Sequence, residues 1–283
     1  MISVIICSRR TDITDELKKN ISNTIGCDYE LVVIDNSHNS FSIFQAYNKG
    51  VQSSHGEILC FLHEDVLFHT SNWGKIVSSH LLEHHEVGAI GFLGGHYLPH
   101  RPCYWSEPRV ESVHYIQGEV VNGVYSNRKI CHQKYRSERT FVAAIDGVFM
   151  AIPRSVFDNY QIRWDDITYS GYHFYDADMC MQLHQIGLDI EVLWDVWMEH
   201  KSCGDTGESF LKARNVWYNK WQEYLPVIKG IELTEEDIDI CRIIIDITDQ
   251  SYRYGQIRES IAYRLGKAIL HPSLFNIRRL FSR

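Results

Sequence analysis

Short, nearly continuous apolar runs alternate with polar-faced segments along the first third of the chain. Apolar runs lie at residues 2–7, 30–37, 56–65 and 87–95. Runs of this kind, rich in β-branched residues, are typical of strands buried on both faces of a parallel sheet. The segments between them predict helices at residues 12–24, 41–53 and 73–85. This alternation predicts an α/β fold with a doubly wound, mostly parallel sheet flanked by helices.

The middle of the chain lacks this regularity. From about residue 96 to 140 the sequence is rich in Tyr, His, Pro and Arg, and Asn122-Gly123 indicates a tight turn. We therefore expect an insertion that carries a hairpin. Beyond it, the pattern predicts a buried strand at 141–153, a helix at 176–186 and a strand at 189–197.

The last 60 residues differ in composition and predict a helical extension over residues 223–283. Thr234, followed by three acids, has the pattern of a helix N-terminus. The predicted apolar face of this helix comprises Ile240, Ile243, Ile244 and Ile247. Residues 232–249 carry seven acids and one Arg, and residues 252–283 carry seven Lys/Arg and one Glu. We expect these opposite charges to neutralise each other, with peripheral membrane contact by the basic tail as the alternative.

Composition narrows the function classes. A hydrophobic fraction of 45% supplies an ordinary globular core, and a net charge of −8 disfavours nucleic acid as a partner. The eight cysteines form no CxxC pair, which indicates reduced thiols, a cytoplasmic location and no zinc site. The N-terminal apolar run is too short for a signal peptide or a membrane span.

The apolar run CFLHEDVLF is interrupted by His63, Glu64 and Asp65. Unpaired charge is costly to bury, so such groups are solvated or bound to something. Ligands of open α/β sheets bind at the carboxyl ends of the strands. These three residues therefore predict a site for a hard divalent cation that carries a phosphorylated substrate.

Three other polar positions follow predicted strands or begin a predicted helix, and each has a structural alternative. Asp35 has the pattern of a turn or a helix cap. Asp176 and Asp178 both fall at the start of a helix, and we expect Asp178 to support that helix or to orient Asp176. His200 alone is compatible with a structural histidine.

Six segments, taken in order, resemble one enzyme family. They are SVIICSRR, ELVVIDNS, AYNKGVQSSHGEILCFLHEDV, IDGVFMAIPRSVF, YDADMCMQLHQIG and MEHKSCG. Together they resemble family-2-like inverting glycosyltransferases of the GT-A fold, especially a bacterial subgroup. The resemblance covers residues 1–222, with the nucleotide-sugar half at about 1–95 and the acceptor half at about 96–222.

The resemblance implies a metal-assisted single displacement. Asp176 would be the catalytic base, while Asp65 and His200 would bind Mn²⁺ or Mg²⁺, the imidazole favouring Mn²⁺. The implied donor is a nucleotide-diphosphate sugar, with UDP as the expected nucleotide, and the implied acceptor is a sugar or a lipid-linked glycan. The implied donor-binding residues are Cys7, Ser8, Arg9, Asp35, Asn48, His63, Glu64 and Asp65. The implied acceptor-binding residues are Trp105, Gly147 and Tyr175.

Three positions depart from the family pattern. His63 replaces the first acid of the metal-binding motif, Tyr47 replaces an Arg, and Tyr175 replaces a Glu before the base. These departures keep a non-catalytic sugar-nucleotide binder open as an alternative. A nucleotidyltransferase is a second alternative, although the segment after the first strand supplies no phosphate-binding glycine.

Overall fold

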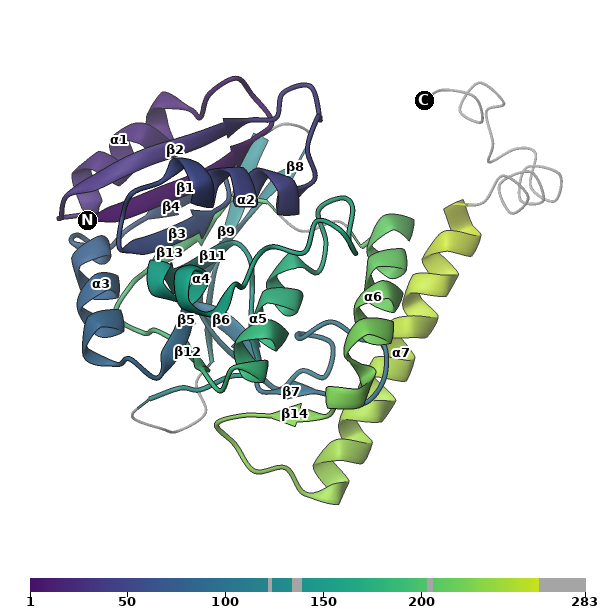
Figure 1. Cartoon of the computed structure of the whole chain (residues 1–283). Helices are drawn as coiled ribbons and strands as arrows, with labels where there is room; N and C mark the ends of the chain where they lie inside the picture. Colours follow the sequence, from purple (N-terminus) through teal and green to yellow (C-terminus); the bar gives the residue numbers. More distant parts are fainter. Residues whose placement is uncertain (122–123, 134–138, 203–205, 260–283) are drawn as a thin grey trace, which may run out of the picture.

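The computed structural model describes residues 1–121, 124–133, 139–202 and 206–259. Its central sheet has the strand order β12-β5-β11-β3-β1-β2 (Figure 1). Among these described strands, β11 alone runs antiparallel to its neighbours. The bounds are β1 (Ile2–Ser8), β2 (Tyr29–Asp35), β3 (Ile58–Leu62), β5 (Val87–Gly91), β11 (Phe149–Pro153) and β12 (Asp189–Val192). The predicted α/β class and the mostly parallel sheet are confirmed.

A second sheet contains β10-β6-β8-β13-β4, with β9 paired to β8. Their bounds are β4 (Val66–Phe68), β6 (Leu93–Gly95), β8 (Glu111–Val121), β9 (Val124–Gln133), β10 (Ala144–Ile145) and β13 (Met198–His200). The β8–β9 pairing confirms the predicted hairpin, whereas Asn122-Gly123 lie outside the described residues. A small third sheet pairs β7 (Tyr97–Leu98) with β14 (Val227–Ile228).

Two predicted strands are each divided between the sheets. The run 87–95 forms β5 and β6, and the run 141–153 forms β10 and β11. The second division falls at Asp146, whose carboxylate accepts the Val148 N–H at 2.8 Å and turns the chain. A one-strand prediction was wrong at both places, because an apolar run does not show where a buried chain changes sheet.

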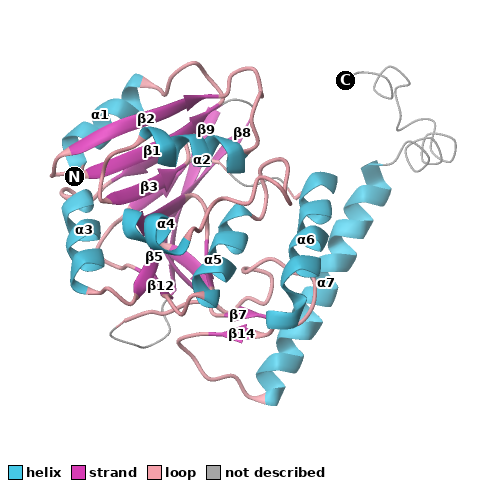
Figure 2. Cartoon of the chain, viewed as in Figure 1, coloured by secondary structure: helices cyan, strands magenta, loops and turns pink. Residues whose placement is uncertain are grey.

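The helices flank the sheets (Figure 2), and the first two of them begin at side chains that cap them. Thr14 accepts the Leu17 N–H at the start of α1, and Ser42 forms a capping box with Gln45 at the start of α2. The bounds are α1 (Asp15–Thr24), α2 (Ile43–Ser53), α3 (Trp73–Glu83), α4 (Arg154–Tyr160), α5 (Tyr175–Gln185), α6 (Glu208–Trp221) and α7 (Glu235–Glu259), with a short 3₁₀ helix at Gln222–Tyr224.

Strand β2 is an edge strand, so its side chains are only half-buried. The prediction that residues 30–37 are buried on both faces was therefore wrong. Edge position depends on strand order, which the apolar run itself does not encode.

The predicted apolar face of α7 was also wrong. Ile240, Ile243 and Ile247 are exposed, whereas Cys241 and Ile245 are buried. Ion pairs turn the helix this way, because its acids reach two arginines of the main body. Arg101 pairs with Asp246 at 2.8 Å, and Arg214 pairs with Asp249 at 2.6 Å.

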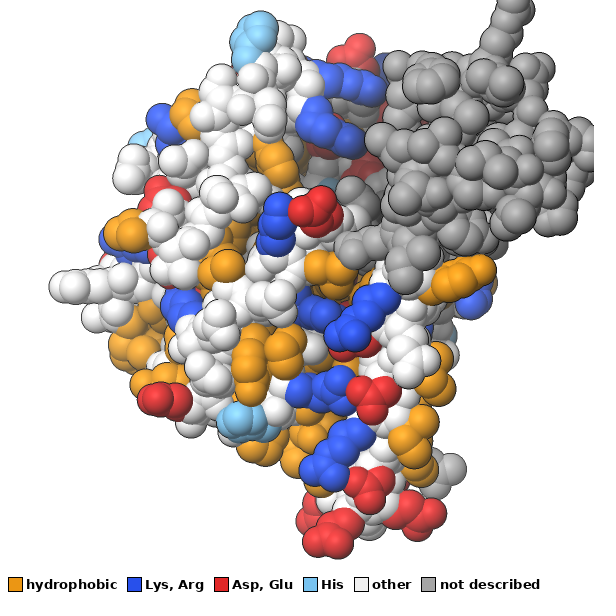
Figure 3. Space-filling model, turned by 90° about the vertical axis from the view of Figure 1, so that its right-hand side faces the viewer, with side chains coloured by type: hydrophobic (Ala, Val, Ile, Leu, Met, Phe, Trp, Pro, Cys, Tyr) orange, Lys and Arg blue, Asp and Glu red, His pale blue; other side chains and the backbone are white. Residues whose placement is uncertain are grey.

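Figure 3 turns α6 and α7 toward the viewer and shows charged and hydrophobic side chains interspersed on this face. The basic tail beyond residue 259, on which the membrane-contact prediction depends, lies outside the described residues. Within the described part, no helix is long and apolar enough to cross a membrane. The seven described cysteines are free, in keeping with the expectation of reduced thiols.

Candidate active site

The three polar residues after β3 point to three different partners. His63 contacts Tyr175, Glu64 contacts the end of β1, and Asp65 contacts His200. The strand ends of the central sheet, the start of α5 and the end of β13 therefore meet around this one tripeptide.

Glu64 holds the loop after β1. Its carboxylate accepts the Ser8 hydroxyl at 2.6 Å, the Arg9 main-chain N–H at 3.2 Å and the Arg9 Nε–H at 2.9 Å. Ser8 also lies opposite Asp35 in the parallel β1–β2 register. The predicted donor residues Ser8, Arg9, Asp35 and Glu64 thus lie at adjoining strand ends, with Asp35 exposed there.

Asp35 shows its structural alternative, and Cys7 is held as a neutral thiol. Asp35 accepts the Ser37 N–H at 2.9 Å, which is the turn that the sequence allowed and which lowers the pKa of this carboxyl. Burial raises the pKa of the Cys7 thiol to about 11, so it is protonated at neutral pH. Contact of either residue with a donor stays a prediction.

Asp65 and His200 are brought together by strand pairing. In the antiparallel β4–β13 pair, His200 lies opposite Val66, and the Lys201 N–H donates to the Asp65 carbonyl at 3.0 Å. The side chains follow, with His200 Nε2 at 3.6 Å from Asp65 Oδ1. Two residues 135 positions apart in the sequence therefore share one site.

The residues of this cluster fit a divalent metal. One ligand atom from each of His63, Asp65 and His200 lies within 4.8 Å of the others. His200 Nε2 is buried and has no hydrogen-bond partner among the residues that the structure describes. A buried polar atom without a partner is costly, and a metal ion would satisfy this nitrogen.

The protonation states suit metal binding. Burial lowers the pKa of His200, while burial and the repulsion of His200 lower the pKa of His63 to about 4. Burial opposes ionisation of Asp65, but His200, His63 and the Ser202 hydroxyl outweigh it and lower the pKa of this carboxyl. At neutral pH the cluster therefore offers two neutral imidazoles and a carboxylate, the forms that bind metals.

Asp176 lies in the first turn of α5 and is 3% exposed. Its Oδ2 accepts the Tyr104 hydroxyl at 2.6 Å and the Gly147 N–H at 3.0 Å, and its Oδ1 accepts the Ala177 N–H at 2.8 Å. Burial raises its pKa, although these three donors act in the opposite direction. The carboxyl is thus held rigidly and is more basic than an ordinary aspartate.

A second carboxyl, Asp146, was missed by the sequence reasoning. The Tyr104 hydroxyl that donates to Asp176 also lies 3.5 Å from Asp146 Oδ2. Burial and the neighbouring Asp176 raise the pKa of Asp146 to about 7. The sequence pattern could have identified Asp146, because this acid interrupts an apolar run just as the tripeptide after β3 does.

Asp178 is a structural residue, as one of the sequence alternatives proposed. Its carboxylate accepts hydrogen bonds from Tyr169 at 2.9 Å, Gln182 at 2.9 Å, Trp221 at 2.8 Å and the Lys220 ammonium at 2.7 Å. Two of these donors, Lys220 and Trp221, come from α6, so Asp178 joins α5 to α6.

Two predicted site residues are used elsewhere. The Asn48 side chain makes both its hydrogen bonds to the backbone of Trp164, at 2.7 and 3.1 Å. Trp105 is 3% exposed and packs in the core, beside Gly95. An acceptor contact by Trp105 and a donor contact by Asn48 both stay predictions.

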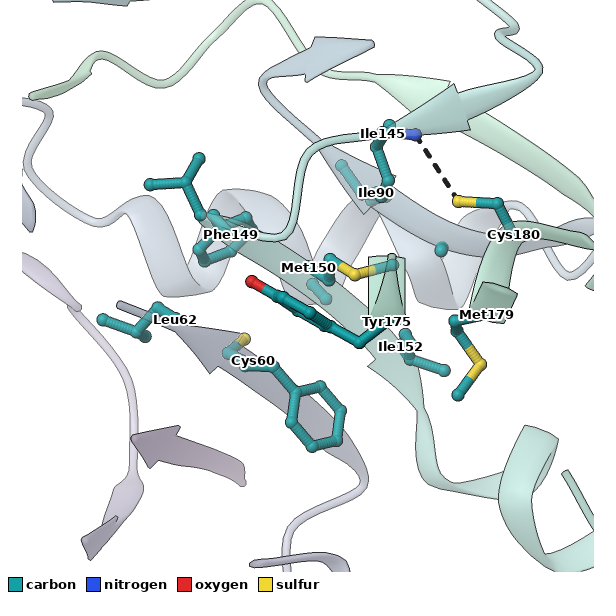
Figure 4. Close-up of a cluster of buried hydrophobic side chains, with 14 of the residues drawn as sticks. Cys60, Leu62, Ile90, Ile145, Phe149, Met150, Ile152, Tyr175, Met179 and Cys180 are labelled. Atoms are coloured by element: carbon teal, nitrogen blue, oxygen red, sulfur yellow. Dashed lines mark hydrogen bonds between the residues drawn. The ribbon is translucent and has the colours of Figure 1, made fainter. Parts of the chain in front are cut away.

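Gly147 and Tyr175 do lie at the site. A Cβ on Gly147 would be 2.2 Å from the Tyr175 hydroxyl oxygen, so the close approach of this ring requires glycine. Tyr175 lies in the hydrophobic cluster of Figure 4, with its hydroxyl directed away from Ile152 and Met179. Contact of these two residues with an acceptor stays a prediction.

Comparison with known proteins gives one matching family and several solved structures of low sequence identity. The chain matches the model described as "Glycosyltransferase like family" over residues 3–223. A search of curated proteins found no match. Similar solved structures include GalNAc-T7 with UDP, GalNAc and Mn²⁺, at 12% identity and TM-score 0.48, covering 74% of this chain and 44% of that one.

Residues 1–349 of S. aureus TarS give a similar result. The structure without a stated ligand has 13% identity and TM-score 0.48, covering 71% of this chain and 60% of that one. The complex with UDP-GlcNAc has 13% identity and TM-score 0.47, covering 86% and 65%. The chain thus spans less than two thirds of each of these three solved chains.

Proposed function

This chain belongs to the glycosyltransferase-like family, and from that premise we propose that it transfers a sugar from a nucleoside-diphosphate donor to an acceptor hydroxyl. UDP is the proposed nucleotide, and inversion by single displacement is the proposed stereochemical course. The alternative activities, nucleotidyl transfer and sugar-nucleotide binding without turnover, are outcomes of the test below.

The observation that carries this proposal is that His200 Nε2 is buried beside Asp65 Oδ1 and has no hydrogen-bond partner among the described residues. These two residues would hold a divalent metal, Mn²⁺ or Mg²⁺. When bound, such an ion supplies positive charge that offsets the negative charge of a departing diphosphate. A site of this kind at the strand ends is where an α/β sheet binds its ligand.

The loop after β1 supports the donor assignment. Glu64 accepts one hydrogen bond from the Arg9 main-chain N–H and one from the Arg9 Nε–H, while the rest of the Arg9 side chain is largely exposed. In the proposal, this loop and Asp35 bind the nucleotide, with the Asp35 carboxylate accepting a hydrogen bond from the base. Cys7 and Asn48 are further proposed donor contacts.

Asp176 is the proposed general base. It directly follows Tyr175, whose hydroxyl contacts the metal cluster, and its pKa is raised. A base with a pKa nearer neutrality removes a proton from an attacking hydroxyl more effectively, and general bases contribute about 10²- to 10⁴-fold in rate. The Tyr104 hydroxyl would have to leave Asp176 when an acceptor hydroxyl binds there.

The acceptor is proposed more broadly, as a sugar or a lipid-linked glycan. Gly147 and Tyr175 border Asp176 and the metal cluster, so an acceptor hydroxyl reaching the base passes them. Cell-surface polysaccharide or glycoconjugate synthesis is the setting that the sequence resemblance favours.

The test is a panel of nucleotide sugars incubated with the protein, with and without Mn²⁺, while nucleotide products are measured. We expect release of a nucleoside diphosphate, lost in Asp65→Asn and reduced about 10²- to 10⁴-fold in Asp176→Asn. Asp158→Asn, an exposed acid on α4, is the matched control. Release of pyrophosphate would indicate nucleotidyl transfer instead. Binding of a nucleotide sugar without turnover would indicate a non-catalytic binding protein.

A further inference from the structure

Of the three positions that depart from the family pattern, Tyr175 contacts both of the others, His63 and Tyr47. The Tyr175 hydroxyl lies 2.8 Å from His63 Nε2, and the Tyr175 ring packs edge-on against Tyr47 with centroids 5.7 Å apart. They come from the end of β3, the start of α5 and the middle of α2.

Tyr175 fixes the His63 ring. Because Tyr175 occupies Nε2, the other ring nitrogen is left toward the acid, with Nδ1 at 4.0 Å from Asp65 Oδ1. The His200 ring is close by, with its centroid 5.5 Å from that of His63. An imidazole that binds a metal through one nitrogen uses the other to hydrogen-bond a partner that sets its orientation and tautomer.

Tyr175 is itself held in place. Its ring is buried, it contacts Phe44 and Trp164 as well as Tyr47, and it lies directly over Gly147. A hydroxyl on a ring packed this closely has a defined position, so the hydrogen bond to His63 costs little conformational entropy.

We propose that His63 binds the divalent metal through Nδ1, together with Asp65 and His200, and that Tyr175 is the positioning residue that directs this nitrogen into the site. With two nitrogen ligands and one carboxylate, the site takes a transition-metal ion such as Mn²⁺ or Co²⁺ in preference to Mg²⁺, which favours oxygen ligands. This inference rests on the metal site of the proposed function.

The test measures metal binding alone, without donor or acceptor. The full chain is stripped with a chelator, and Co²⁺ is titrated while its visible absorption is recorded. Mn²⁺ is titrated separately by electron paramagnetic resonance, and Mg²⁺ is added as a competitor. We expect Mg²⁺ to bind at least about 10-fold more weakly than Mn²⁺.

Two variants test the roles of the individual residues. His63→Ala should weaken Mn²⁺ binding and change the Co²⁺ spectrum, because one nitrogen ligand is lost. Tyr175→Phe keeps the ring and removes the hydroxyl, and it should weaken Mn²⁺ binding about 10- to 100-fold. Tyr169→Phe is the matched control, since it removes an equally buried hydroxyl that bonds Asp178. Circular dichroism confirms that each variant is folded.

The outcomes separate this inference from the proposed function. If His63→Ala and Tyr175→Phe bind Mn²⁺ as the wild type does, or if Mg²⁺ competes equally, the inference is overturned. Sugar transfer that depends on Asp65 would then still stand. Conversely, if both variants lose Mn²⁺ affinity but the wild type releases no nucleoside diphosphate from any donor, the inference holds and the proposed function fails.

Discussion

Asp65 and Asp178 are both mostly buried carboxylates near the start or end of a core element, yet their surroundings differ. Asp178 accepts hydrogen bonds from four side chains, one of them the Lys220 ammonium. Asp65 accepts a hydrogen bond from the Ser202 hydroxyl and faces two imidazoles at 3.6 and 4.0 Å, beyond hydrogen-bond distance. A carboxylate whose oxygens are saturated with hydrogen bonds supports the fold. A carboxylate beside a buried nitrogen that lacks a hydrogen bond is available to a ligand.

Asp176 lies between these two cases. Its main-chain donors and Tyr104 hold it firmly, as at Asp178, but it shares its surroundings with a second carboxyl, Asp146. Two acids this close cannot both ionise without cost, so the pair retains a proton to higher pH. This arrangement is the one expected of a proton acceptor rather than of a structural residue.

The largest effect on stability is expected at Asp178. Asp178→Ala leaves four donors without their acceptor and removes one charge partner of Lys220, so the free energy of unfolding should fall by about 3–5 kcal/mol. Urea denaturation measures this change. Asp158→Ala on α4 is exposed and should stay within about 0.5 kcal/mol of the wild type. Weaker Mn²⁺ binding in folded Asp178→Ala would contradict the assigned separation of the two sites.

A second effect is expected at Asp146, and it depends on pH. Its pKa of about 7 in the folded protein exceeds the value of about 3.9 in the unfolded chain. Ionisation of Asp146 therefore costs no folding stability below about pH 4, and the free energy of unfolding falls as the pH rises through 7. Asp146→Asn removes this loss, so the variant should match the wild type at pH 4 and exceed it by at most about 4 kcal/mol at pH 8.

Thermal or urea unfolding between pH 4 and 8 checks this prediction. The double variant with Asp176→Asn sharpens it, since Asp176 then carries no charge and the benefit of Asp146→Asn should shrink. Equal stability differences at pH 4 and pH 8 would show that the pKa of Asp146 is not raised in the folded protein, and an undiminished benefit in the double variant would show that the two acids do not interact.

The sequence predicted the members of the metal cluster but not their orientation. Asp65 followed from the polar tripeptide after a predicted strand and His200 from the family resemblance, and β4–β13 pairing brings them together. The tripeptide's three separate partners depend on register and sheet order, which no local pattern contains. Tyr104 illustrates the same limit, because aromatic composition does not distinguish a residue that binds Asp176 from one that stacks on a sugar.

Helix α7 shows why apolar spacing alone was insufficient. Ile243 and Ile245 are both large aliphatic residues on one helix, yet only Ile245 is buried. Helical periodicity permits either face, and the ion pairs of Asp246 and Asp249 with the main body select one. Such long-range pairs link residues more than 30 positions apart, so they are not visible in a window of the sequence.

The smallest effect on the metal-free protein is expected at Asp65, and it completes the comparison with Asp178. Asp65→Asn removes a charge that no hydrogen-bonded imidazole compensates, so unfolding without metal should change by less than about 1 kcal/mol. Mn²⁺ at 100 times its dissociation constant should stabilise the wild type by about 2.7 kcal/mol and the variant not at all. Urea denaturation with chelator and with Mn²⁺ measures both quantities. A large loss in chelator would mean that Asp65, like Asp178, supports the fold, and the distinction between saturated and available carboxylates would no longer hold in this molecule.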